Sequence, residues 1–203
     1  MKSIRIITMA MAMLVSMSMM GQNPSKAKEI LDKTAANLNS QGGAQADFTL
    51  SSDGVGSISG TIFIKGKKFH ATTPKASIWF DGKTQWTYMK SSDEVNVSTP
   101  NESQQAQMNP YKFITLYKNG YRLGVKEQGN VWEVHLTALN RGRSIQEMYV
   151  YVSKSYLPTK VRLLEDRKWS EISIRNFKNS PQPDSMFTFN AKDFPEAEVI
   201  DLR

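Results

Sequence analysis

The sequence of 203 residues contains no cysteine and only two histidines, and both shortages exclude classes of chemistry. Without cysteine the chain has no disulfide framework and no thiolate nucleophile. It also has no signal-peptide cysteine to which a lipid could be attached. His70 and His135 stand 65 positions apart, whereas the HExxH motif places two histidines on one face of a single helix. We therefore expect both histidines on the surface of strands, and we predict no metal site.

The sequence also lacks recognisable catalytic motifs. Gly54, Gly56 and Gly60 do not form a GxGxxG pattern, and neither a Walker-type phosphate loop nor a GxSxG nucleophile elbow occurs. Adjacent acids occur at Asp93-Glu94 and Glu165-Asp166, but neighbours on a strand point to opposite faces and cannot act as a catalytic pair. The sequence favours a protein that is not an enzyme and needs no cofactor. A secreted enzyme with an unrecognised site is the alternative.

The long hydrophobic run of this chain stands at its N-terminus. Lys2 and Arg5 precede the apolar run Ile6–Met20, and a small residue follows it. This order is typical of a secretory signal peptide. The run has 15 residues, which is short for a membrane-spanning helix of about 20. We predict a signal peptide over residues 1–21 and a single soluble domain over residues 22–203, with a retained anchor as the alternative.

The charge of the chain is moderately basic and is spread along the sequence. The formal net charge is +7, and it falls to +5 when Lys2 and Arg5 are removed with the signal peptide. The remaining lysines and arginines form no tract, and no nucleic-acid-binding motif accompanies them. The sequence therefore predicts no nucleic-acid partner.

Residues 60–100 show the clearest structural pattern in the chain. Short runs alternate apolar and polar residues, which is the period of a strand with two different faces. Asp81-Gly82 favours a tight hairpin turn, because both central positions of such a turn need positive φ. These features predict a meandering antiparallel sheet. Its alternating apolar positions are Ile62, Ile64, Ile78, Phe80, Trp86, Tyr88, Val95 and Val97.

Two segments are predicted as amphipathic helices. Asn23-Pro24 is typical of a helix start, since it combines a capping side chain with proline at the first helical position. Apolar residues then recur at helical spacing until Gly42-Gly43. Asn109-Pro110 repeats the start signal, and a short apolar helix is expected from there to Asn119-Gly120. We expect both helices to cover the sheet.

The rest of the chain alternates again with the period of strands, and no linker divides it. About eleven strands with two helices make one α+β domain that is mostly antiparallel sheet. A sheet of this size curls towards a barrel or half-barrel, because the twist of its strands accumulates.

Aromatic residues are concentrated in the predicted sheet and the second predicted helix. They could fill the core of an ordinary sandwich, or they could line an apolar cavity that a curved sheet encloses beneath the helices. The residues are Phe63, Phe69, Trp79, Phe80, Trp86, Tyr88, Phe113, Tyr117 and Trp132.

Four stretches together resemble one known family. The runs SGTIFIKGKKF, DGKTQWTY, EVNVS and NPYKFITLYKNG are similar to the periplasmic outer-membrane lipoprotein carriers, the LolA family. The resemblance extends from EILDKTAANL to FNAKDFPEAEVIDLR, which is nearly the whole mature chain. It implies an unclosed antiparallel half-barrel with a helical lid and an apolar cavity.

The resemblance also implies a function without catalysis. Members of the family are monomers in the periplasm of Gram-negative bacteria. They take acylated lipoproteins from an inner-membrane ABC-type releasing complex and deliver them to an outer-membrane acceptor. A periplasmic lipid-sensing regulatory protein with the same half-barrel is the alternative. The cavity residues implied are Ile62, Ile64, Phe69, Trp79, Trp86, Tyr88 and Trp132, and the lid residues implied are Ile30, Leu31, Phe113, Ile114 and Tyr117.

One departure from the family pattern concerns the lid. The family typically has Arg-Pro at the end of the first long strand, where the arginine bonds the lid. This sequence has Gly66-Lys67-Lys68 there. A lysine is a point charge on a flexible stem and does not reproduce the planar fork of arginine. These residues therefore do not support the lid switch that the resemblance implies.

Overall fold

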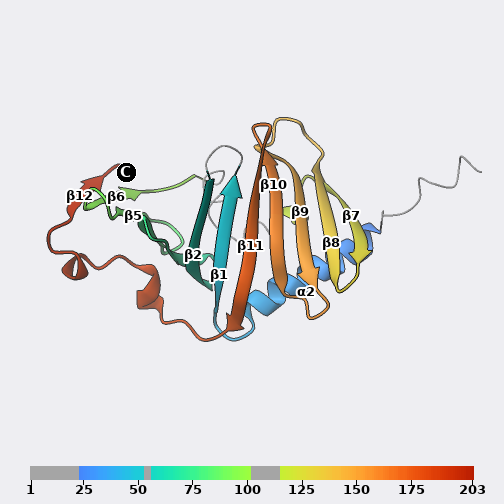
Figure 1. Cartoon of the computed structure of the whole chain (residues 1–203), viewed down its shortest axis with the longest axis horizontal. Coiled ribbons are helices and arrows are strands. Elements are labelled where there is room, and N and C mark those ends of the chain that lie inside the picture. The colour runs from blue at the N-terminus through green and yellow to red at the C-terminus, as the bar shows by residue number, and fades with distance from the viewer. Residues whose placement is uncertain (1–22, 53–55, 102–114) are drawn as a thin grey trace, which may run out of the picture.

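The computed structural model describes residues 23–52, 56–101 and 115–203 (Figure 1). The predicted signal peptide over residues 1–21 lies outside the described residues, as does most of the second predicted helix. Within the described ranges, no helix is both long and apolar enough to cross a membrane.

The first predicted helix forms as α2 (Pro24–Asn39). The side chain of Asn23 accepts a hydrogen bond of 2.9 Å from the backbone nitrogen of Lys26, and Pro24 occupies the first turn, where its missing N–H costs nothing. Gly42 follows the helix at φ +74, a conformation that favours glycine. The local signals in the sequence therefore place this helix correctly.

The described chain contains twelve strands in one sheet. From edge to edge their order is β12-β6-β5-β4-β3-β2-β1-β11-β10-β9-β8-β7. The strands are β1 (Ala44–Ser52), β2 (Gly56–Lys65), β3 (Lys68–Thr72), β4 (Ala76–Phe80), β5 (Gln85–Met89), β6 (Glu94–Ser98), β7 (Tyr121–Gln128), β8 (Val131–Ala138), β9 (Ile145–Ser153), β10 (Pro158–Glu165), β11 (Lys168–Asn179) and β12 (Glu198–Asp201).

Two meanders, β1 to β6 and β7 to β11, make up most of this sheet. Within each meander, consecutive strands pair antiparallel. The meanders meet where β1 pairs antiparallel with β11, with Phe48 opposite Ile174. β12 returns to pair parallel with β6 at the far edge. A long-range pairing therefore joins the two halves at the centre of the sheet.

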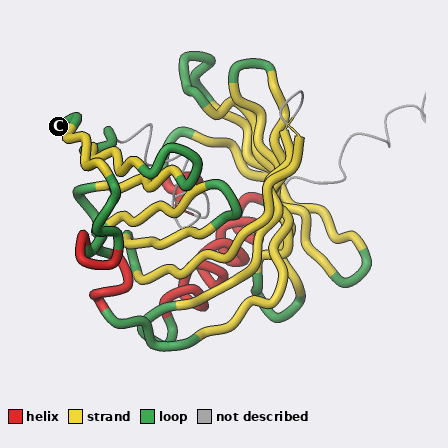
Figure 2. The backbone as a smooth tube through the Cα atoms, turned by 60° about the vertical axis from the view of Figure 1, so that its left-hand side comes forward, coloured by secondary structure: helices red, strands yellow, loops and turns green. Residues whose placement is uncertain are grey.

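The sheet curls around α2 without closing into a barrel (Figure 2). The accumulated twist of so many strands bends the sheet, and β12 and β7 remain as its two edges. α2 lies against the concave face, across β7, β11 and β2. The predicted half-barrel with a helical cover is thus confirmed, with twelve strands where about eleven were expected.

The interior of the half-barrel has two apolar clusters. In the larger cluster, Ala27, Ile30 and Leu31 of α2 pack against inward-facing residues of β7 to β10 such as Val134 and Met148. The smaller cluster lies under β1 to β4 and consists of Ala46, Ile62, Ile64, Phe69, Ala71 and Phe80. The helix therefore fills the half-barrel under β7 to β10, whereas side chains of the strands themselves form the cluster under β1 to β4.

The described end of the second predicted helix is the 3-10 turn η1 (Leu116–Lys118). Tyr117 is buried in the larger cluster, and its hydroxyl donates a hydrogen bond to Asp32 of α2. Hydrogen bonds from Lys28 first, and then from Tyr117, lower the pKa of the Asp32 carboxyl. This contact ties the segment before β7 to the helix.

Candidate binding cavity

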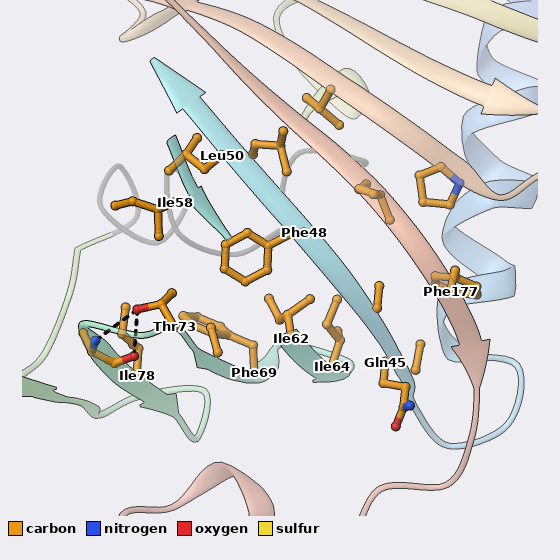
Figure 3. A pocket seen from close by; sticks show the side chains of 18 of the residues that line it. Gln45, Phe48, Leu50, Ile58, Ile62, Ile64, Phe69, Thr73, Ile78 and Phe177 are labelled. Carbon is orange, nitrogen blue, oxygen red and sulfur yellow. Dashed lines mark hydrogen bonds between the residues drawn. The ribbon is translucent and has the colours of Figure 1, made fainter. Parts of the chain in front are cut away.

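An apolar cavity of about 470 Å³ lies on the concave face, between the strands of the smaller cluster and the C-terminal end of α2 (Figure 3). The helix contributes Leu38 to its wall. The central strands β1 and β11 contribute side chains that point to this face because they alternate with outward-facing polar residues. These side chains are Phe48, Leu50, Ile172 and Ile174. Phe177 joins them because an irregularity at Asn176, where φ is 52, shifts the pairing of β11 with β1.

Three residues expected in a cavity line this one. Ile62 and Ile64 come from β2 and Phe69 from β3, and they are 7%, 4% and 2% exposed. Ile64 pairs directly with Phe69 across the two strands, so their side chains share the concave face. Their placement follows from the period of two that the sequence shows at these positions.

Trp79, Trp86 and Tyr88 lie on the opposite face of the sheet, which corrects the position expected for them. Trp79 pairs with Trp86, whereas the neighbouring Ile78 lines the cavity. Tyr88 lies two residues beyond Trp86 and shares its face. The family resemblance implied these residues as cavity lining, but the parity of each position along its strand determines the face.

The outward-facing rings form an aromatic cluster that the C-terminal segment covers. Phe194 lies 5.7 Å from Trp79 and 4.6 Å from Tyr88 between ring centroids. Phe189 lies 5.5 Å from Trp79 and 5.3 Å from Phe194. His70 of β3 stacks on Trp79 from the neighbouring strand. These large side chains therefore stabilise the attachment of residues 180–203 to the outer face.

Trp132 lies far from the cavity, near the first turn of α2. Its ring is 5.0 Å from that of Tyr156, and the ammonium groups of Lys26 and Lys154 lie 5.8 and 4.5 Å from its centroid. It packs at the margin of the larger cluster. Its position fixes the N-terminal end of the helix on the sheet.

The residues expected in the lid fall into two groups. Ile30 and Leu31 are fully buried beneath α2, in the larger cluster together with Tyr117. Phe113 and Ile114 lie outside the described residues. The described lid residues therefore pack against β7 to β10, beside the cavity.

Lysines beside Gly66 hold the C-terminal segment. Lys68 Nζ lies 3.0 Å and Lys65 Nζ 3.1 Å from a carboxylate oxygen of Asp184, in the 3-10 turn η2 (Asp184–Phe187). Lys65 also donates to the carbonyl oxygen of Gln182 at 3.0 Å. Hydrogen bonds from Lys68 and Lys65 lower the pKa of Asp184. The end of this strand therefore engages η2, where the family arginine would bond a lid.

The sequence prediction missed several residues that line the cavity. Phe48 and Leu50 alternate with Asp47 and Thr49, so the period of two at these positions was a signal that could have found them. Lys75 also lines the cavity, from the turn between β3 and β4. Only the tertiary structure brings that turn to the cavity.

Histidine, tyrosine and acidic side chains of the described residues lie away from the cavity wall. In residues 23–52, 56–101 and 115–203, no three His, Asp or Glu side chains come together as a metal site would require. Burial lowers the pKa of His70. Burial and a hydrogen bond to Glu147 raise the pKa of Tyr149 to about 12. Both rings lie on the outer face, so neither can act on a molecule in the cavity.

Comparison with known proteins agrees with this geometry. The family model described as outer membrane lipoprotein carrier protein LolA matches residues 17–167. No curated protein matches the chain.

Two solved structures share the fold, and a third matches less well. An uncharacterised conserved protein from Thermus thermophilus is 16% identical with a TM-score of 0.58, and the match covers 87% of this chain and 99% of that one. A DUF1329 family protein from Desulfovibrio piger is 9% identical with a TM-score of 0.50, covering 84% and 99%. A LolA superfamily protein from Nitrosomonas europaea is 14% identical with a TM-score of 0.46, covering 80% and 97%.

Proposed function

The chain belongs to the family of the outer membrane lipoprotein carrier protein LolA, and from this premise we propose that it is a periplasmic carrier of lipidated molecules. It shields the acyl chains of lipoproteins, or of similar cargo, in the apolar cavity. It then moves them between the inner and the outer membrane without catalysing a reaction.

The observation that carries this proposal is the cavity itself. Its wall is built almost wholly from aliphatic and aromatic side chains, including Ile62, Ile64 and Phe69. Burial of each methylene contributes about 0.8 kcal/mol, so a long acyl chain gains on the order of 10 kcal/mol before the costs of association. An apolar wall of this kind suits a hydrocarbon chain and offers few groups for recognising a polar metabolite.

The partners follow from the same proposal. The predicted signal peptide directs the chain to the periplasm of a Gram-negative bacterium. There an inner-membrane ABC-type complex supplies the lipidated cargo, and an outer-membrane acceptor receives it. The carrier acts as a monomer.

Recovery of bound cargo tests the proposal. The protein is purified from the periplasm of its own host and analysed by native mass spectrometry. We expect a lipidated species on the wild-type protein and its loss from Ala76→Phe, since Ala76 lines the cavity and a phenyl ring there occupies its volume. Thr137→Phe, at an exposed position of β8, is the control and keeps the cargo. Wild-type protein that never carries a lipidated species would rule the proposal out.

A further inference from the structure

We propose that acyl cargo in the cavity places an anionic headgroup beside Lys75 and Lys90. The ligand class is therefore an acyl amphiphile with a carboxylate or phosphate head. This inference rests on the proposed acyl-chain function and specifies which cargo the cavity accepts.

The cavity has room for at least one acyl chain. A methylene group needs about as much room as a water molecule, roughly 30 Å³. The cavity of about 470 Å³ therefore holds on the order of fifteen methylenes or more.

Charge is found at one end of the cavity. Figure 3 shows Thr73 at one end of the lining and Phe177 at the other. Lys75 lines the cavity beside Thr73, in the turn that joins β3 to β4. Lys75 is the one charged residue that lines the cavity among the described residues, so the Phe177 end carries no charge. The cavity therefore has a cationic end and an uncharged end, as an anionic amphiphile does.

A second lysine stands directly beside the first. The backbone nitrogen of Lys90 donates to the carbonyl oxygen of Lys75 at 3.0 Å. Lys90 Nζ donates to the carbonyl oxygen of Thr73 at 2.8 Å. The ammonium of Lys90 thus lies on the same turn as Lys75, which concentrates positive charge where the cavity ends.

These two ammonium groups are available to an anion. Among the ion pairs of the described residues, those of Lys65 and Lys68 include Asp184, but none includes Lys75 or Lys90. The hydroxyl of Thr73 is already engaged in its own turn, since it accepts from the backbone nitrogen of Ala76 at 3.0 Å and bonds its carbonyl oxygen. The lysines are therefore the groups at this end that can recognise a headgroup.

The remaining polar residue of the wall does not distinguish anions. Gln45 lines the cavity near Ile64, at a distance from the Thr73 turn in Figure 3. Its amide is neutral and can bond either a charged or an uncharged head. Selectivity for an anion therefore depends on the two lysines.

Titration calorimetry with defined probes tests this proposal on the purified protein. The probes are palmitate, palmitoyl lysophosphatidic acid and neutral hexadecanol. We expect palmitate or the lysophospholipid to bind more tightly than hexadecanol. Whichever of the two anions binds more tightly identifies the source of the headgroup as a fatty acid or a phospholipid.

Variants show whether the two lysines supply this selectivity. Replacing both Lys75→Met and Lys90→Met should weaken binding of the anionic probe roughly fivefold, the size expected for a part-exposed ion pair. Binding of hexadecanol should not change. Lys83→Met, in the exposed turn before β5, is the matched control.

Two results would contradict the proposal in different ways. Equal affinity for hexadecanol and palmitate, unaffected by the lysine changes, would overturn the headgroup site alone. A protein that binds none of the three probes would overturn the acyl-chain function and this inference with it.

Discussion

The imidazole of His70 stacks on the indole of Trp79 on the outer face of the sheet, with ring centroids 4.9 Å apart and planes 15° from parallel. The ring of Phe63 stacks on the other side of His70 at 5.9 Å. The Nδ1 atom of His70 is buried and has no hydrogen-bond partner in the described part of the chain. These three stacked rings lie on the outer face of the sheet, and the cavity lies on the other face of the same strands.

The enclosure of His70 makes the stability of the protein depend on pH. Burial lowers the folded-state pKa of His70 below the unfolded value near 6.5, so the unfolded state binds the proton more readily. The contribution of His70 is therefore complete above about pH 6.5 and is lost as the pH falls through the lower, folded-state pKa. One proton limits this slope to about 1.4 kcal/mol per pH unit.

Urea unfolding at pH 7.5, 6.5 and 5.5 measures this dependence. We expect the free energy of unfolding to fall towards pH 5.5 and the fall to be smaller in His70→Phe. His135→Gln, on the opposite half of the sheet, serves as the control. Its free energy of unfolding should still show the part of the fall towards pH 5.5 that His70 causes. An unchanged slope in His70→Phe would show that other groups cause the loss.

The two faces of the sheet should respond differently to matched polar substitutions. Ile78→Asn places an amide against the cargo, which costs about 1–3 kcal/mol and weakens acyl-chain binding about tenfold or more. Trp86→Asn, on the adjacent strand but the other face, should leave the affinity within about twofold. Displacement of a fluorescent fatty acid measures both affinities. A loss of affinity in Trp86→Asn equal to that in Ile78→Asn would contradict the assignment of faces.

Phe194 holds the C-terminal segment through its contacts with Trp79 and Tyr88. Phe194→Ala should lower the free energy of unfolding by about 1–3 kcal/mol, since the ring is only partly buried. Amide hydrogen exchange should become faster in β12 and β6, while β8 and β9 keep their protection. A uniform increase across the sheet would show instead that the segment does not open by itself.

Gly60 lies where β2 passes close to β3 and to the cavity wall. A Cβ atom there would stand 2.2 Å from the carbonyl oxygen of Thr72 and 2.9 Å from the ring of Phe48. Gly60→Ala must displace the backbone of β3, so it should lower stability by about 1–3 kcal/mol. Gly142→Ala meets only the side-chain oxygen of Asn140 at 3.3 Å and should be near neutral. Thermal unfolding of both variants decides whether the close approach matters.

Local chemistry in the sequence determined much of the fold. Asn23-Pro24 and Gly42 set the limits of α2, because capping and φ preferences act within a few residues. The alternation at Ile62 and Ile64 placed both side chains on one face of β2. The curl of a large antiparallel sheet followed from strand twist. These features depend on neighbours in the chain and could be predicted from it.

The tertiary structure alone decided which face became the cavity. Alternation divides Ile78 and Trp79 between two faces, but both faces of β4 carry apolar side chains. The pairing of β1 with β11 placed Phe177 beside the cavity, and residues 180–203 covered the outer aromatic rings. These contacts join residues more than a hundred positions apart. Burial of apolar surface is non-directional, so the sequence pattern shows what must be covered, and only the folded chain determines what covers it.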